Sequence, residues 1–341
     1  MSAVLAPVAT DAAAAAKPDR RRFIGGSDVA AVMGLSPWET PVELWEEKAG
    51  HKPPSTEIDL ERERRFRRGH KLEPFIREMV MEKLQDEGLR VELLAVNQRY
   101  QDTEHPFLAC EIDFELRLWG ETQIGERIYT FDGTEVNADA KSVSGFARRK
   151  WGTESNTDVP IEYACQFMHG MGIRGRRVCL VAALRSFDDV DIYWTEADDE
   201  VIQAMRAKCV DFWMNHVLAD VPPDPINFSD IKRLFPSDNG QRKEASREVA
   251  LKIEALRVLR ARRTADELDE ETLAFEIGQF IEPASEVVYD GKVIATFKAQ
   301  GDTRLDAKTL RQEEPDLFAR YARTKTIRVL RIPKDPKPVK N

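Results

Sequence analysis

The six residues from Val136 to Lys141 constrain the fold more than any other stretch of this 341-residue chain. Their order, Val-Asn-Ala-Asp-Ala-Lys, alternates small apolar with polar residues, as a half-buried β-strand does. Successive side chains of a strand point to opposite faces, so Asp139 and Lys141 are expected on one face and the small residues on the other. A carboxylate beside an ammonium group is either half of a metal-dependent phosphodiesterase site or a surface ion pair.

A helix that precedes this strand offers another polar group. Residues 57–87 carry apolar side chains at three- and four-residue steps, and their polar side is rich in arginine, as in an amphipathic helix. Pro74 predicts a kink or a restart within it. Glu73 lies at the margin of the apolar stripe, where a carboxylate needs a partner. The alternatives for that partner are a metal ion and a neighbouring arginine.

Strands follow this helix. Residues 89–94 are one candidate, and residues 108–116 alternate clearly between apolar and acidic side chains. Asp113 belongs to the acidic face, together with Glu111 and Glu115. Three carboxylates along one face repel one another unless a cation lies among them. Asp113 is therefore a second candidate for cation binding, one strand before the opening stretch.

A second helix and a further strand complete the arrangement after a basic loop at residues 144–159. Pro160 is expected to begin a helix that carries Tyr163 and Gln166 on one side, and residues 178–184 form a strongly apolar strand. The predicted order of helix, three strands, helix and strand is like that of the PD-(D/E)xK nucleases. We therefore expect an α/β fold with a restriction-endonuclease-like core, in which helices flank a mixed central sheet.

The chemistry of such a core needs these residue types. Mg²⁺ prefers carboxylate oxygens, so Asp113 and Asp139 are the expected core ligands, Glu73 would help to hold a second ion, and Mn²⁺ would substitute. Bound ions stabilise charge on a scissile phosphate and lower the pKa of the attacking water. Lys141 would position or activate that water and offset negative charge in the transition state. Gln166 would orient Lys141 or the water.

Near the amino end, three arginines precede a glycine-rich turn, Gly25-Gly26-Ser27-Asp28. Ser27 is the expected N-cap of a helix that Gly34 ends. The two glycines let backbone N–H groups approach a ligand, so the turn is either a phosphate cradle or a plain helix cap. Trp38, a little further along, is expected in the core.

Composition limits the remaining possibilities. The net charge is −9, yet Lys and Arg are clustered, and residues 318–341 hold eight of them against one Asp. An acidic chain with such patches can still follow a phosphate backbone. The four Cys form no C-x-x-C pair, which argues against a zinc or iron–sulfur site and fits reduced thiols in the cytosol. No run of about eighteen apolar residues is present, so no membrane span is expected.

The chain is expected to have three parts. Residues 1–19 form an Ala-rich disordered segment, and residues 20–225 form the nuclease domain, which ends at a proline-rich boundary. Residues 226–341 form a small α+β appendage. Its expected elements are a charged helix at 244–264, a second helix at 265–278, a hairpin with a turn at Asp290-Gly291, two short helices and a basic tail.

On five motifs, the sequence resembles the YqaJ-type viral recombinase family, which is related to the phage lambda exonuclease. The motifs occur in family order: Ile24–Asp28 with Gly34–Trp38, Gly69-x-x-Leu72-Glu73-Pro74, Asp113, Asp139-Ala140-Lys141, and Tyr163-x-x-Gln166. The family usually has Glu at the position of Asp139 and Gly at the position of Phe114. Asp is one methylene shorter, and the wider nuclease superfamily accepts either carboxylate.

The resemblance implies a 5′→3′ exonuclease that degrades double-stranded DNA and leaves a 3′ single strand for an annealing protein. It implies a ring-shaped homo-oligomer around the duplex, and a phage- or prophage-encoded enzyme in the cytoplasm of a bacterial host. The residues implied in 5′-phosphate and DNA binding are Ser27, Arg20, Arg21, Arg22 and Tyr163.

Three alternatives stay open from the sequence. A structure-selective or restriction-like endonuclease could use the same metal site, although the Gly-Gly-Ser-Asp turn favours recognition of a DNA end. A DNA-binding member without cleavage would be free to lose one of Glu73, Asp113, Asp139 and Lys141, so the intact set argues against it. A scaffold without nuclease activity would require all five motifs to coincide by chance.

Overall fold

The structure, a computed structural model, describes residues 19–52, 60–143, 151, 159–184, 189–324 and 326–333. The chain divides into two compact units, Met1–Leu234 and Phe235–Asn341. The expected disordered segment, most of the expected loop at 144–159 and the end of the basic tail lie outside the described residues. None of the described helices combines the length and the apolar character that a membrane span requires.

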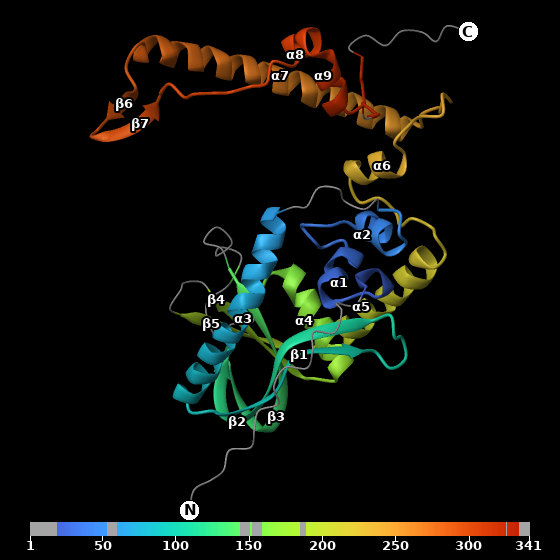
Figure 1. Ribbon diagram of the computed structural model, residues 1–341, viewed down its shortest axis with the longest axis vertical. Coiled ribbons are helices and arrows are strands. Elements are labelled where there is room, and N and C mark those ends of the chain that lie inside the picture. Colours follow the sequence, from blue (N-terminus) through green and yellow to red (C-terminus); the bar gives the residue numbers. More distant parts are fainter. Residues whose placement is uncertain are drawn as a thin grey trace, which may run out of the picture. The chain divides into compact units, whose positions relative to one another are not determined.

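The first unit is built on a five-stranded mixed sheet in the order β1-β2-β3-β4-β5 (Figure 1). The strands are β1 (Arg90–Gln101), β2 (Ala109–Ile124), β3 (Arg127–Ser142), β4 (Val178–Leu184) and β5 (Val190–Glu196). Within this sheet, β3 and β4 pair in parallel, and the other neighbouring strands pair antiparallel. A parallel pair needs a crossover, which here contains a helix, α4 (Ile161–Arg174). The predicted α/β class with a mixed central sheet flanked by helices is confirmed.

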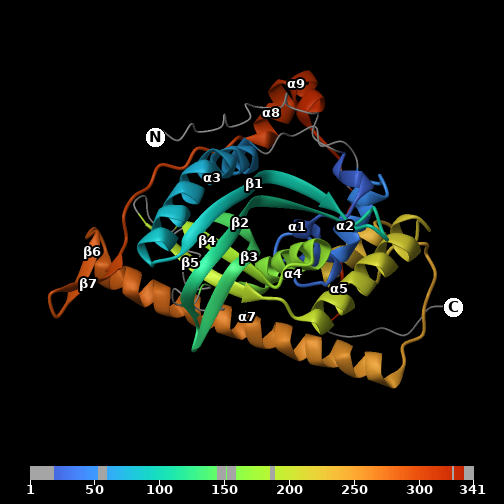
Figure 2. The same ribbon diagram turned by 90° about the horizontal axis from the view of Figure 1, so that it is seen from below.

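Helices cover both faces of this sheet (Figure 2). On one face, α3 (Leu60–Asp86) packs Ile76, Val80 and Leu84 against apolar side chains of the central strands. On the other face, α4 packs against β4 and β5. The sequence had suggested a kink or a restart at Pro74. The helix α3 does not restart there. Pro74 is exposed, so the carbonyl group that loses its helical partner can be hydrated, while the apolar stripe stays on the sheet.

Helices from the amino-terminal and carboxy-terminal parts of the first unit pack together in one layer. Its members are η1 (Arg20–Arg22), α1 (Gly26–Val32), α2 (Pro41–Lys48), α5 (Asp199–Asp211), the π-helix η3 (Phe212–Val217) and α6 (Phe228–Leu234). They share a core that includes Val29, Trp45 and Phe212. Two expectations are wrong here. The N-cap of α1 is Gly25, whose N–H donates to Asp28, and Trp38 is 65% exposed.

The second unit contains one long helix, α7 (Arg247–Ile281), where the sequence had predicted two. The stretch around the expected break consists of good helix formers and holds no Gly or Pro, so nothing in it ends the helix. The predicted hairpin is present as β6 (Glu286–Tyr289) and β7 (Lys292–Thr296). Asp290 and Gly291 between them have φ of 48° and 70°, as a two-residue hairpin turn requires. Two short helices follow, α8 (Ala307–Glu313) and α9 (Pro315–Tyr321).

Candidate active site

The opening strand of the sequence lies in the middle of the sheet, as the last part of β3. Val136 and Ala138 belong to the core under α3. Asp139 and Lys141 lie on the opposite face and form an ion pair with each other. Asp139 is 6% exposed. The alternation of the strand thus places a buried carboxylate and an ammonium group together, below α4.

Asp113 reaches this pair from β2, at the point where β2 and β3 separate. The last paired residues of the two strands are Phe114 and Ala138, and beyond them β3 continues along β4. The backbone N–H of Ala140 therefore lacks a ladder partner on that side. It donates to Oδ2 of Asp113 at 2.8 Å. The Asp113 side chain thus satisfies a backbone group and is fixed one residue from Asp139 and Lys141.

The charges of these three side chains are strongly coupled. Burial raises the pKa of Asp113 well above its usual value, and the negative charges of Asp139 and Glu73 add to this effect. Burial alone would lower the pKa of Lys141, but Asp139 and Asp113 hold it above its usual value. Lys141 is thus an ammonium ion at neutral pH. The carboxyl groups of Asp139 and Glu73 supply the negative charge around Asp113.

The helix α4 contributes the next contacts. Nε2 of Gln166 donates to Oδ2 of Asp139 at 2.9 Å. The ring of Tyr163, one turn earlier, has its centroid 5.4 Å from Nζ of Lys141, and the ring of Phe167 lies at 5.7 Å. Both distances suit a cation–π interaction. Phe167 was not predicted, although its place four residues after Tyr163 on one helix could have indicated it.

An aromatic group surrounds Tyr163. The ring of Trp38 lies 5.7 Å from it and that of Trp151 lies 5.6 Å from it, between ring centroids. Trp38 is thus not a core residue but an exposed side chain beside the site. No local pattern predicts this contact, because Trp38 and Trp151 are distant from Tyr163 in the sequence and meet it only in the folded chain.

Glu73 is less directly placed. It lies on α3, and its Oε1 is 2.8 Å from Nδ1 of His70. Among the described residues, His70 is therefore a polar partner of Glu73 that the sequence analysis did not consider. Within the described part of the chain, no three His, Cys, Asp or Glu side chains come close enough to form a metal-binding group. The structure brings Asp113, Asp139, Lys141 and Gln166 together and leaves Glu73 at longer range.

The donor set at this point fits a hard divalent cation. Asp113 and Asp139 offer only carboxylate oxygens, which Mg²⁺ and Mn²⁺ prefer. Burial and then repulsion by Asp139 raise the pKa of Asp113, and a bound cation would offset both effects. Glu111 and Glu115, the other acidic side chains on this face of β2, do not take part in this repulsion. Glu115 pairs with Arg174 and Arg176, and Glu111 is exposed.

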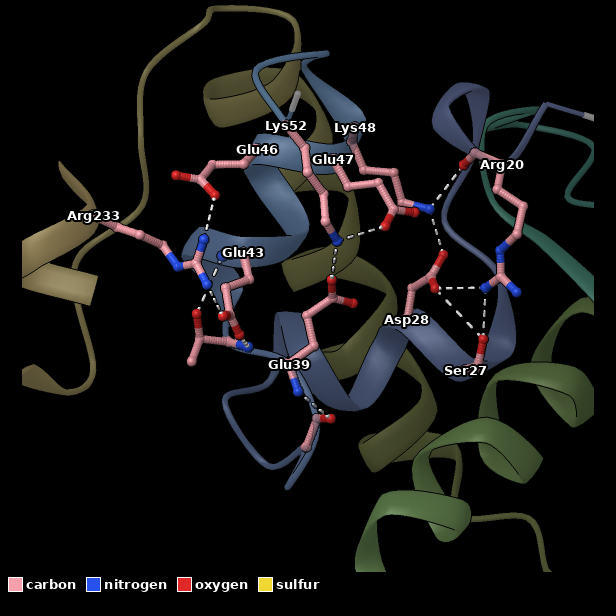
Figure 3. Close-up of polar contacts among 12 residues, drawn as sticks. Arg20, Ser27, Asp28, Glu39, Glu43, Glu46, Glu47, Lys48, Lys52 and Arg233 are labelled. Carbon is pink, nitrogen blue, oxygen red and sulfur yellow. Dashed lines mark hydrogen bonds and ion pairs between the residues drawn. The ribbon is translucent and has the colours of Figure 1, made fainter. Parts of the chain in front are cut away.

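The glycine-rich turn forms a separate polar cluster beside α4 (Figure 3). Nη2 of Arg20 donates to Oγ of Ser27 and to Oδ1 of Asp28, both at 2.8 Å. Nζ of Lys48 donates to Oδ2 of Asp28 at 2.6 Å. Burial alone would raise the pKa of Asp28, but Lys48 and Arg20 hold it below its usual value. Asp28 and Lys48 are therefore a buried ion pair that the sequence did not reveal.

The three arginines before this turn divide into two groups. Arg20 lies with Ser27, whereas Arg21 and Arg22 pair with Asp19 within η1. The turn nevertheless adjoins the carboxylate cluster. A Cβ atom at Gly26 would lie 3.0 Å from Cγ of Gln166, so this backbone approaches α4 directly at the residue that holds Asp139. Gln166 thus lies against the glycine-rich turn and also donates to Asp139.

The part of the chain that carries this site is similar to known proteins. Residues 17–177, which include every candidate residue above, match the sequence model of the YqaJ-like viral recombinase domain. The chain is 23% identical over 307 residues to the uncharacterized protein YqaJ of Bacillus subtilis (strain 168), and the match covers 88% of each protein.

Two solved structures are similar to this chain, with lower sequence identity. They are an alkaline exonuclease from Laribacter hongkongensis (TM-score 0.40, 16% identity, 63% of this chain and 94% of that one) and a phage-related exonuclease from Haemophilus somnus 129PT (TM-score 0.35, 11% identity, 58% and 96%).

Proposed function

Because residues 17–177 match the sequence model of the YqaJ-like viral recombinase domain, we propose that this protein is a metal-dependent deoxyribonuclease. It degrades double-stranded DNA in the 5′→3′ direction and leaves a 3′ single strand for an annealing protein. One observation carries the proposal. Asp113 and Asp139 converge where β2 leaves β3, with the Lys141 ammonium paired to Asp139 and Gln166 donating to Asp139.

Each residue has a task in this proposal. Asp113 and Asp139 would hold a Mg²⁺ or Mn²⁺ ion, and Glu73 would approach from α3 toward a second one. When bound, such an ion lowers the pKa of a water molecule and stabilises charge on the scissile phosphate. Lys141 places a positive charge beside the same phosphate, and the rings of Tyr163 and Phe167 hold its side chain in position.

Gln166 and the hydrogen bond from Ala140 orient the two carboxylates before substrate arrives. Gln166 fixes Oδ2 of Asp139, and the Ala140 N–H fixes Oδ2 of Asp113. Side chains held in this way need not reorganise during the reaction, which is the main source of electrostatic catalysis. The two donors, Gln166 and the Ala140 N–H, belong to α4 and β3. These are regular elements of the core rather than loops, which keeps the geometry precise.

Ser27 and Arg20, with Arg21 and Arg22, are proposed to receive the 5′-phosphate. The support is their position, because the turn that carries Ser27 packs on Gln166. A terminal phosphate held there would present the first phosphodiester bond to Asp139 and Lys141. Arg20 is already paired with Asp28, so it would contact a phosphate through its remaining donors. Arg22, whose side chain is 85% exposed, would exchange its ion pair with Asp19 for such a phosphate.

The proposal also includes the surroundings of the enzyme. It acts in the cytoplasm of a bacterial host, as a homo-oligomeric ring around duplex DNA, beside an annealing protein. The alternative that shares the metal site is an endonuclease that cuts within a strand. The two differ in what they need, because an end-dependent enzyme requires a free 5′ terminus and an endonuclease does not.

Incubation of three DNA substrates decides between them. Linear duplex with a 5′-phosphate, the same duplex without it, and a covalently closed circle are treated in Mg²⁺ and in EDTA. We expect loss of linear DNA in Mg²⁺ only, faster with the 5′-phosphate, and an intact circle. Cutting of the closed circle would establish the endonuclease instead. No cleavage of any substrate in Mg²⁺ or Mn²⁺ would overturn the nuclease assignment itself.

A further inference from the structure

The long helix α7 presents apolar side chains to solvent. Its 35 residues span about 52 Å at 1.5 Å per residue (Figure 2). Leu251, Val258, Leu273 and Phe280 are 61, 58, 60 and 78% exposed. Other exposed apolar side chains of α7, among them Leu259, Leu268 and Phe275, lie on its other faces. A helix with so much exposed apolar surface usually contacts a partner.

Six residues form one stripe along this helix. They are Leu251, Val258, Arg262, Asp269, Leu273 and Phe280. Successive members are seven and four residues apart in alternation, close to two turns and one turn, so all six lie on one face. The combined period of eleven residues matches an almost straight helix. The spacing is the same when read from either end of the helix. Two such stripes that run antiparallel therefore place their members opposite one another.

The charge of α7 reverses along its length. From Arg247 to Arg263 the helix carries six Lys or Arg side chains and two Glu, and from Thr264 to Ile281 it carries six Asp or Glu and no Lys or Arg. Within the helix, Lys252 pairs with Glu248, Arg257 with Glu254 and Arg263 with Glu267. No ion pair among the described residues involves Arg262 or Asp269.

We propose that α7 is a dimerisation element that packs antiparallel against α7 of a second copy of this chain. The two-fold axis passes between Ala265 and Asp266. In this register Leu251 of one copy faces Phe280 of the other, and Val258 faces Leu273. Each such contact occurs twice, as in any isologous interface.

The charges select the antiparallel direction. Arg262 of one copy lies opposite Asp269 of the other, and the basic half of each helix lies along the acidic half of its partner. Parallel pairing would place basic against basic and acidic against acidic, which repulsion disfavours. A second copy is therefore the occupant that complements both the apolar ends and the charged centre of the stripe. This contact is independent of the nuclease site and of any ring formed by the first unit.

Charge reversal tests the pairing in the full-length chain, whose mass is 38.9 kDa. One variant carries Arg262→Glu with Arg263→Glu, and the other carries Asp269→Arg with Glu270→Arg. Light scattering after size exclusion should show that each variant alone has half the mass of the wild-type assembly. An equimolar mixture should recover the full mass, because acidic and basic helices then pair. Circular dichroism of each variant should match the wild type, which shows that folding is unaffected.

Cysteine crosslinking tests the direction and the register. The four native thiols are buried. Val258→Cys mixed with Leu273→Cys should form an intermolecular disulfide, while neither variant should link to itself, since like positions lie about 22 Å apart in the antiparallel pair. Self-linking of each single variant would show a parallel pair and overturn the proposal. So would a wild-type mass equal to that of the charge-reversed variants, or a mixture that fails to recover.

Discussion

Replacement of Asp113 by Asn is expected to make the protein more stable and inactive at once. Burial and the charges of Asp139 and Glu73 raise the pKa of Asp113, so its ionised form is unfavourable in the folded state. Asn keeps an oxygen that can accept the N–H of Ala140, which is now 2.8 Å from Oδ2. The substitution therefore removes the repulsion and keeps the backbone contact.

The size and the pH dependence of the gain follow from this. A group whose pKa is higher in the folded state than in the unfolded state binds more protons when folded, so the stability of the wild type falls as pH rises above the usual value of 3.8. The Asn variant lacks this dependence. We expect a gain of about 1 kcal/mol at neutral pH, which raises the unfolding midpoint of a unit of this size by about 2–4 °C.

Thermal unfolding at pH 5.0 and 7.5, with and without MgCl₂, measures the effect for the wild type, Asp113→Asn and a matched control. The control is Glu111→Gln, which removes an exposed carboxylate from the same strand. Mg²⁺ should stabilise the wild type and the control but not Asp113→Asn, because a ligand stabilises only the fold that binds it. A metal-free Asp113→Asn variant that is less stable than the wild type would refute the reasoning, as would equal stabilisation of all three proteins by Mg²⁺.

Three further substitutions have distinct expected results. Asp28→Asn leaves the buried ammonium of Lys48 without its counter-charge, so the free energy of unfolding in urea should fall by about 3 kcal/mol. Burial lowers the pKa of His169, so the unfolded chain binds the proton first and wild-type stability should fall below about pH 6.5. His169→Gln should reduce that loss between pH 7.5 and 5.5. Gly26→Ala adds a methyl group 3.0 Å from Cγ of Gln166 and should slow cleavage by about tenfold.

Each of these has a control and a result that would contradict it. Asp19→Asn removes an exposed partner of Arg21 and should leave stability unchanged; equal effects at Asp19 and Asp28 would contradict the buried-pair argument. Identical acid profiles of His169→Gln and wild type would exclude His169 as the source. Gly69→Ala, where a Cβ meets nothing within 4 Å, should cleave normally, and the Gly26 argument fails if both variants do.

The strands and the faces on which their side chains lie could be predicted because both depend on local periodicity. Alternation from Val136 to Lys141 placed Asp139 and Lys141 on one face, and the order of helices and strands indicated the mixed sheet. The turn residues Asp290-Gly291 likewise predicted the hairpin that the structure contains. These signals lie within a few residues, where backbone geometry alone decides which way side chains point.

What could not be predicted depends on contacts between distant residues. The hydrogen bond from Ala140 to Asp113 exists because β2 and β3 separate there, which no pattern in either strand shows. Trp38 was expected in the core, yet it contacts Tyr163 beside the site. Asp28 and Lys48 form their pair across two helices. Pro74 was expected to kink or restart a helix, but α3 continues through it, because the packing of the apolar stripe on both sides outweighs the lost hydrogen bond.

The cleavage rate of Lys141→Met tests the central claim most directly. Met keeps an unbranched apolar side chain against Tyr163 and Phe167 but removes the positive charge beside the carboxylates. On linear duplex with a 5′-phosphate in Mg²⁺, we predict a fall in rate of at least about 100-fold, with a circular dichroism spectrum like that of the wild type. Wild-type cleavage by a folded Lys141→Met variant would show that the active site lies elsewhere in the chain.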